Sequence, residues 1–402
     1  MPRHGFEGVW YPPANPDGLT ELEVAAGLVV GQGVGPPLAP DRSVHPIAVL
    51  RDLSATLLAT PPCVVAFSGG RDSSALLAVL VDVARAEGLD EPIAVTARWD
   101  DDEASDESAW QEEVVRTIGV NRWEILRPGT DLDLLGDEAV GVLDRLGLVW
   151  PAPAYALLPM IRLAAGGVFL SGEGGDEAFG LWPYGRLWAD IRSRRTPRRS
   201  DLRALALGCT PRALRRRRWQ RNLPPYQTWL QPAALARVAE RMADDQADDP
   251  LRWDHYQVIS RRRRAVDLTQ QTLERLSALD GSRFVAPFVD ERFLAALAAW
   301  GGPLGRGDRT AVMTALFSDV LPGPVMARTS KASFGGVFWG PASRRFAAEW
   351  DGTGLSPELV DPEALRRAWT APVPVYGSAL PLQAAWLYAR REHRQPAGSP
   401  SP

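Results

Sequence analysis

The stretch that most constrains the fold is residues 68–74, Ser-Gly-Gly-Arg-Asp-Ser-Ser, which directly follow the apolar run 64–67. A β-rich run, a glycine turn flanked by hydroxyl groups and then an apolar helical pattern predict a strand–loop–helix unit that cradles a polyphosphate. Two glycines let the backbone approach an anion closely, and the first turn of the helix presents free N–H groups and the positive end of its dipole. Asp72 adds a hard oxygen ligand of the kind that Mg²⁺ prefers. The ordinary nucleotide P-loop does not fit, because it needs a lysine directly after its second glycine, and the single lysine of the chain is Lys331.

Short apolar runs alternate with helical patterns from Cys63 onward. Strands are predicted at 64–67, 93–97, 123–126 and 168–170, and helices at 47–58, 73–86, 105–118 (with Ser105 near its start as N-cap) and 155–164. This alternation predicts an α/β fold, a doubly wound parallel sheet whose ligands bind beyond the carboxyl ends of the strands. No strand is predicted after about residue 185, so the C-terminal half is expected to be largely helical.

A second glycine loop, residues 171–180 (Ser-Gly-Glu-Gly-Gly-Asp-Glu-Ala-Phe-Gly), follows the fourth predicted strand. It carries three carboxylates within five residues. A lone acidic glycine turn is usually a surface loop, but two such loops at matching strand ends favour one shared site. Asp72 and Asp176 are therefore expected to hold Mg²⁺–pyrophosphate from opposite sides, and Glu173 is the candidate general base.

The first loop resembles the pyrophosphate loop of the ATP pyrophosphatases, and both loops together resemble those of the asparagine synthetase-type amide-forming domain. Further matches follow in order at residues 106–107, 287–290, 321–322 and 328–334, so the resemblance covers roughly residues 45 to 393. It implies an adenine nucleotide alpha hydrolase-like fold, ATP and Mg²⁺ as cofactors, and cleavage of ATP between its α- and β-phosphates.

The resemblance also implies roles for individual residues. Those expected to hold pyrophosphate are Ser68, Gly69, Gly70, Asp72 and Ser73. Those expected to line the adenosine pocket are Ala66, Val95, Ser171 and Gly172. Asp72 and Asp176 would hold the metal, Glu173 would be the base, and Lys331 would stabilise the α-phosphate. Arg309 stands where relatives often place a second lysine and is a further candidate for nucleotide binding.

Lys331 also stands out without the resemblance, because the chain has 44 arginines and one lysine. A chain that uses arginine for ordinary positive charge has kept one compact ammonium group, which is a better point charge for a crowded phosphoryl transition state. Chance retention of a surface lysine is the alternative interpretation.

The order of segments suggests which amide ligase this is. Residues 1–55 are expected to be a short N-terminal segment without a glutaminase domain, 56–393 the amide-forming domain, and 394–402 a disordered tail. The basic middle, the Trp-Leu-Gln-Pro-Ala element at 229–233 and residues 385–390 resemble lasso peptide macrolactam synthetases (cyclases). The expected reaction is therefore adenylation of a carboxylate and its joining to an amine in a peptide precursor, with a precursor peptidase as a possible partner.

Three alternatives remain open at this level. One is an asparagine synthetase-like enzyme that uses free ammonia or a small-molecule amine. Another is a tRNA-modifying ATP pyrophosphatase that holds RNA on the basic block 186–264, which contains 20 arginines and 8 acidic residues. The last is an inactive remnant that binds a peptide.

Charge and composition exclude several other classes. The net charge of −4 gives the whole chain no nucleic-acid or membrane signature, and two cysteines with four scattered histidines favour neither a disulfide framework nor a zinc site. No apolar run is long enough to span a membrane. A cytoplasmic protein, with access to ATP, is expected.

Overall fold

The computed structural model describes residues 15–33, 38–99, 105–180, 182–222, 226–328 and 335–394. Within them, one parallel sheet of five strands has the order β3-β2-β1-β4-β5. The strands are β1 (Cys63–Ala66), β2 (Ile93–Ala97), β3 (Trp123–Leu126), β4 (Val168–Leu170) and β5 (Arg283–Val285). The sequence order reverses between β1 and β4, which pair directly, with Val64 opposite Phe169. The predicted doubly wound α/β fold is confirmed.

Alternate residues of the strands enter two different hydrophobic cores. Val64, Ile93 and Phe169 belong to one core, whereas their neighbours Val65 and Ala94 belong to the other. Since successive side chains of a strand point to opposite faces, each face of the sheet is covered by a helical layer. Continuous apolar strands such as Cys-Val-Val-Ala are what a sheet buried on both faces requires.

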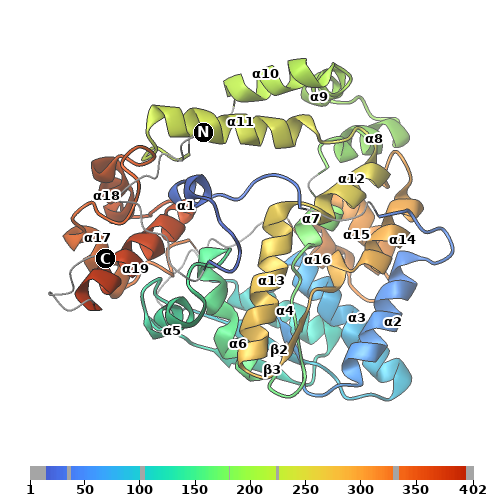
Figure 1. Cartoon of the computed structure of the whole chain (residues 1–402). Helices are drawn as coiled ribbons and strands as arrows, with labels where there is room; N and C mark the ends of the chain where they lie inside the picture. Colours follow the sequence, from blue (N-terminus) through green and yellow to red (C-terminus); the bar gives the residue numbers. More distant parts are fainter. Residues whose placement is uncertain are drawn as a thin grey trace.

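Most helices of the first half lie around this sheet, and the first of them lies apart from it (Figure 1). The helices of this half are α1 (Glu21–Ala26), α2 (Pro46–Leu58), α3 (Arg71–Glu87), α4 (Ser108–Ile118), α5 (Asp137–Leu146), the 3₁₀ turn η2 (Ala152–Leu157), α6 (Leu158–Arg162) and α7 (Gly175–Phe179). The helices α3, α4 and α5–α6 connect the first four strands. Each connection is therefore a helical crossover, which parallel strands require.

The second half is largely helical, as predicted. Its elements are α8 (Gly185–Arg192), α9 (Arg199–Gly208), α10 (Arg212–Asn222), α11 (Pro232–Ala247), α12 (Trp253–Arg261), α13 (Arg264–Leu279), η3 (Pro287–Val289), α14 (Glu291–Gly301), α15 (Arg309–Phe317), α16 (Gly323–Ala327), α17 (Pro341–Glu349), α18 (Pro362–Thr370), η4 (Tyr376–Ser378) and α19 (Ala379–Arg394). In Figure 1, α17 to α19 gather beside α1, whereas α9 and α10 lie at the top, above α11.

Several predicted boundaries are corrected by the structure. β1 begins and ends one residue earlier than expected, and α3 begins at Arg71, two residues before the predicted start. Ser105 is not the N-cap of α4, because that helix begins at Ser108, whose N–H group donates to the Asp106 carboxylate at 2.8 Å. The predicted helix 155–164 is a 3₁₀ turn followed by a short α-helix, and prolines lie within both segments.

The expectation of no strand after residue 185 is wrong. β5 pairs in parallel with β4, with Phe284 opposite Phe169, at the edge of the sheet. It has three residues, and Arg283 at its start is exposed. The short helix α1, capped by Thr20 and Glu23, was also not expected from the proline- and glycine-rich N-terminal sequence. The tail beyond residue 394 lies outside the described residues.

The two cysteines differ in their surroundings, and this gives a first prediction. Cys63 is buried at the start of β1, and burial raises the pKa of its thiol to about 12, whereas Cys209 is exposed. We expect iodoacetamide at about pH 8 to modify Cys209 rapidly and Cys63 only after unfolding, because the thiolate is the reactive form. Peptide mass spectrometry distinguishes the two sites, with Cys209→Ser as the control. Rapid labelling of Cys63 in the folded protein would contradict the buried position of β1.

Across the described residues, none of the helices is both long enough and apolar enough to cross a membrane.

Candidate active site

The two glycine loops lie side by side because β1 and β4 are adjacent and parallel. The first loop leaves the carboxyl end of β1 and leads into α3, and the second leaves the carboxyl end of β4 and leads into α7. A cavity of about 490 Å³ lies between them, lined by both loops and by side chains from several other segments of the chain. This is the position where ligands of open α/β sheets bind.

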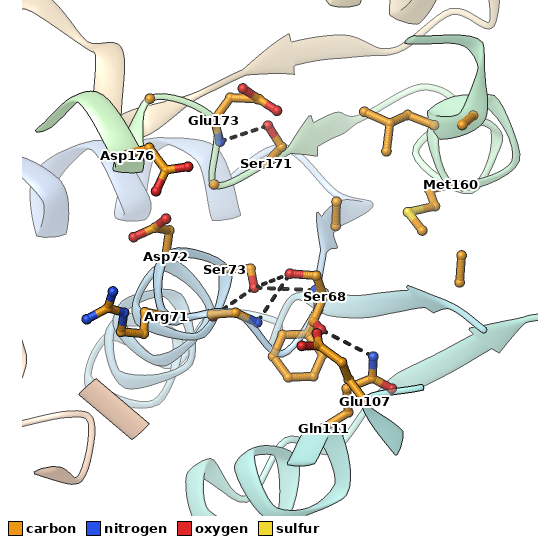
Figure 2. A pocket seen from close by; sticks show the side chains of 18 of the residues that line it. Ser68, Arg71, Asp72, Ser73, Glu107, Gln111, Met160, Ser171, Glu173 and Asp176 are labelled. Atoms are coloured by element: carbon orange, nitrogen blue, oxygen red, sulfur yellow. Dashed lines mark hydrogen bonds between the residues drawn. The ribbon is translucent and has the colours of Figure 1, made fainter. Parts of the chain in front are cut away.

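The first loop is held by hydroxyl and amide contacts (Figure 2). The N–H group of Ser68 donates to the Ser73 hydroxyl at 3.3 Å, and the N–H group of Gly70 donates to the Ser68 hydroxyl at 3.2 Å. Gly69 has a φ of +80°, and a Cβ atom there would lie 2.9 Å from the Gln111 side chain, so glycine is needed on both grounds. Gly70 is the N-cap of α3 and supplies no side-chain cap, which leaves the first N–H groups of that helix for a ligand.

The second loop fits directly against the first. Gly174 has a φ of +85°, and a Cβ atom there would lie 2.2 Å from Val289. A Cβ atom on Gly175 would lie 2.4 Å from the side chain of Asp72. The two glycines therefore allow the loop to turn tightly and to bring its backbone against the carboxylate of the first loop.

Asp72 and Asp176 point toward one another across the cavity (Figure 2), and Arg309 bridges them. One guanidinium nitrogen lies 2.5 Å from Asp72 Oδ2, and another pairs with Asp176 Oδ1. Arg309 is the first residue of α15, whose N-cap Asp308 accepts from the N–H group of Ala311. The structure brings together the two acids that were predicted to share one site, and it places Arg309 between them.

The carboxylate of Asp72 is the unusual group of this cluster. Its side chain is 18% exposed, and within the described residues its Oδ1 atom is buried without a hydrogen-bond partner. Burial raises the pKa of Asp72, and Arg309 opposes that rise. A buried carboxylate oxygen aimed at a cavity is a group that a cation or a donor from a ligand would satisfy.

Arg71 does not join the cluster although it is next to Asp72 in sequence. Its guanidinium reaches away from the cavity centre, toward the Thr310 hydroxyl and the Met326 carbonyl, each at 3.4 Å. It ties α3 to α15 and α16, and Figure 2 shows it pointing away from Asp176.

A second ion pair closes the opposite side of the first loop. Arg328 pairs with Glu107, stacks on the Trp110 ring at 4.9 Å and donates to the Gly69 carbonyl at 3.2 Å. Trp110 Nε1 donates to the same carbonyl at 2.8 Å. Glu107 and Arg328 lie within the sequence matches described above, but their contact was not predicted, since 221 positions separate them.

One wall of the cavity is apolar. Trp99 and Phe338 meet edge to face with their ring centroids 6.2 Å apart. The other apolar side chains of the wall are Ala66, Ala97, Ala156, Leu157 and Met160. This surface suits a flat aromatic group, and neither Trp99 nor Phe338 was singled out from the sequence, where nothing distinguishes them from core aromatics.

The predicted site residues are placed as follows. Those that line the cavity are Ala66, Ser68, Gly70, Asp72, Ser73, Ser171, Gly172, Glu173, Asp176 and Arg309. Gly69 lies in the loop but faces Trp110 and Arg328. Val95 is corrected: it is fully buried in the sheet, and Ala97, nearer the carboxyl end of β2, lines the cavity instead. Lys331 lies outside the described residues, and its role stays a prediction.

A comparison of the sequence with family models identifies the group to which this cavity belongs. The model described as asparagine synthase matches residues 49–388, which include both loops and Arg309. The chain belongs to the asparagine synthase family. This assigns ATP-dependent amide ligase chemistry at the level of the family. Among curated proteins, no sequence matched the chain.

Proposed function

We propose that this member of the asparagine synthase family adenylates a substrate carboxylate, releases pyrophosphate and joins the acyl group to an amine. The observation that carries the proposal is the pair Asp72 and Asp176, held face to face beside the uncapped N-terminus of the 17-residue helix α3. Positive backbone dipole and paired carboxylates together suit a metal-bound polyphosphate.

The residues present fit Mg²⁺. Asp72 Oδ1 is a buried hard oxygen atom without a hydrogen-bond partner in the described part of the chain, and Asp176 faces it. Mg²⁺ in phosphate-transfer sites is usually held by one or two carboxylates together with phosphate oxygens. A bound metal ion would neutralise charge on the phosphates as pyrophosphate leaves.

The side chains of the cavity have separate tasks in this proposal. The N–H groups that open α3 and the hydroxyls of Ser68 and Ser73 bind the pyrophosphate. With a metal-bound polyphosphate present, Arg309 would exchange its two carboxylate partners for phosphate oxygens. Lys331 stabilises charge at the α-phosphate, and Glu173 takes the proton from the attacking amine. The apolar wall with Trp99 and Phe338 stacks on adenine and excludes water from the reactive acyl group.

The proposed substrate is a peptide whose Asp or Glu side chain and amine close a macrolactam ring, as in the lasso peptide family. Support comes from the segment that precedes α19. Val373, Val375 and Tyr376 are exposed apolar side chains, with Val373 72% exposed. The side chain of Tyr376 is half exposed, but desolvation of its phenol group and the negative charge of Glu173 raise the pKa of that phenol to about 12. An exposed apolar segment whose tyrosine senses the charge of the proposed base suits a peptide better than ammonia.

The chain has 15 tryptophans, whose flat rings would suit a peptide site, but their positions give this interpretation little support. Trp229, which lies in the Trp-Leu-Gln-Pro-Ala element, is fully buried and donates to the Ala25 carbonyl at 2.8 Å. Its position is structural: it anchors α1 to the start of α11. Among the described residues, Trp99 is the tryptophan that lines the cavity.

The test is an assay of products with the purified protein, Mg²⁺ and ATP. We expect AMP and pyrophosphate, and a peptide that has lost one water, when the substrate carries an N-terminal amine and an internal acid. Release of ADP and phosphate would overturn the adenylation proposal. If the protein formed an amide from aspartate and ammonium but not from any peptide, only the peptide proposal would be overturned. If it bound and modified tRNA, the tRNA-modifying ATP pyrophosphatase would be favoured.

Glu173→Gln separates the two half-reactions. We expect amide formation to fall about 100-fold, because a general base contributes roughly that much, whereas ATP–pyrophosphate exchange driven by the carboxylate substrate stays near that of the wild type. Glu363→Gln, an exposed position on α18, is the matched control. Equal loss of both half-reactions would show that Glu173 is not a base for the amine.

A further inference from the structure

The helices α8, α9 and α10, residues 185–221, form a segment that we call the basic arm. It contains thirteen arginines and two aspartates, an excess of eleven positive charges, while the whole chain has a net charge of −4 and the remainder therefore −15. In Figure 1, α9 and α10 lie along the top of the molecule, above α11, and α8 lies lower, at the right. None of its residues lines the cavity of the candidate active site.

The arm is attached to the body through specific contacts, so its outer face has a fixed orientation. Arg192 donates to the Gly305 carbonyl at 2.6 Å. Arg215 donates to the Ala247 carbonyl at 2.8 Å, and Arg216 pairs with Asp244 at 2.8 Å. These arginines are structural, and they use the carboxylates and carbonyls that α11 and the loop before α15 offer.

Besides Arg198, six other arginines of the arm are exposed and form no ion pair with any residue of the described ranges. They occur with an exposed aliphatic side chain in three similar groups. The groups are Ile191 with Arg194 and Arg195, Leu202 with Arg199 and Arg203, and Leu214 with Arg217 and Arg221. The three aliphatic side chains are 46%, 48% and 52% exposed.

The spacing places each helical group on one face. Leu202 lies three residues after Arg199, and Arg203 lies four residues after it, so all three share a face of α9. In α10, Leu214, Arg217 and Arg221 follow the same rule and lie on the side opposite to Arg212 and Arg216, which contact Asp244 of α11. The α10 group therefore points away from α11, and the side chains of all three groups are exposed to solvent.

We propose that the outer face of the basic arm is a docking site for an acidic polypeptide segment with aliphatic side chains among its carboxylates. Paired arginines suit carboxylates through bidentate contacts, and each central aliphatic side chain gives a small apolar contact between them. Charges farther than about 8–10 Å are screened at physiological salt, so a short segment confined to the arm is attracted despite the acidic remainder.

The same features disfavour the other polyanions. A membrane-binding helix needs a continuous apolar face, and α9 and α10 each expose one large aliphatic side chain. Single-stranded nucleic acid is usually held by aromatic stacking within a basic groove, and the centres of the three groups are aliphatic. A long nucleic acid would also meet the acidic remainder of the chain.

The test uses a fluorescein-labelled peptide built from the repeat Leu-Glu-Glu-Ala and measures its fluorescence anisotropy with the full chain. We expect salt-dependent binding that weakens about tenfold or more in the variant Arg199→Glu, Arg203→Glu, Arg217→Glu and Arg221→Glu. The matched control, Arg345→Glu with Arg367→Glu on α17 and α18, keeps the affinity of the wild type. A peptide with serine in place of leucine binds more weakly.

Circular dichroism and ATP–pyrophosphate exchange check that the variant is folded and that its active site is intact, since none of the four arginines lines the cavity. If the fourfold variant does not fold, Arg199→Gln with Arg203→Gln gives the same test on α9 alone. Unchanged peptide binding in the folded arm variant overturns the proposal. So does tighter binding of oligouridine or of phosphatidylglycerol vesicles that the arm variant loses.

Discussion

Asp72→Asn is expected to reduce pyrophosphate release by about 10³-fold, because it removes a charged ligand from the centre of the proposed phosphate site. The variant also loses half of the Arg309 bridge, but its side chain has the same size and leaves the close contact with Gly175 intact. The measurement is ATP–pyrophosphate exchange together with product formation, and both should fall by the same factor.

The control for this prediction is Asp52→Asn on α2, where the carboxylate pairs with Arg292 at the surface and both side chains are more than half exposed. It should retain the activity of the wild type. If Asp72→Asn also retained activity, the polyphosphate would have to bind elsewhere, and the assignment of both glycine loops would be wrong.

Arg309→Met should make the protein depend on a divalent cation for its stability. Without the guanidinium, Asp72 and Asp176 face one another without a shared counter-ion, and the pKa of Asp72, which burial already raises, loses the cation that holds it down. We expect a loss of roughly 2–3 kcal/mol in the free energy of unfolding, below the range for fully buried pairs because Asp176 is 43% exposed. For a chain of this length that corresponds to about 3 °C in Tm.

The sharper part of this second prediction is its response to metal. In EDTA the Arg309→Met variant should melt below the wild type, and Mg²⁺ without nucleotide should recover most of the difference, because the ion replaces the missing positive charge. The wild type should respond little, since its arginine competes for the same two carboxylates. Differential scanning fluorimetry measures both effects, and Arg309→Lys should lie between them. If Mg²⁺ raised the Tm of the wild type and of the Arg309→Met variant equally, Arg309 and Mg²⁺ would not compete for the two carboxylates.

Local signals in the sequence predict the two loops. The contacts that the sequence does not predict join residues far apart in the chain. The glycines at 69, 70, 174 and 175 are adjacent to apolar strands, so a few consecutive residues identify each turn. Because both turns follow parallel strands, their common position at one edge of the sheet could be predicted. The Arg309 bridge and the pair of Arg328 with Glu107 join residues between 133 and 237 positions apart, and no local pattern specifies such a contact.

The errors have similar physical causes. β5 is formed by three residues whose alternation is too short to detect, and its identity depends on the free edge of β4. Val95 and Ala97 lie on the same strand, β2. Ala97 can be chosen as the cavity residue only when the position of the carboxyl end of β2 is known. The N-terminus of α4 was misplaced because both Ser105 and Asp106 are good capping residues, and the backbone turn uses the carboxylate.

The strand order β3-β2-β1-β4-β5 also has a consequence for how the chain matures. During synthesis, the first three strands emerge before the others. One edge of β1 stays unpaired until β4, residues 168–170, has been made. The free edge of β4 then stays unpaired until β5, which ends at residue 285, has been made. Arg309 arrives later still. A nascent chain therefore carries an unpaired strand edge for more than a hundred residues, a hazard for aggregation and a natural point for chaperone binding. Since the proposed nucleotide pocket is completed last, ATP should protect from proteolysis only chains that extend past Phe338.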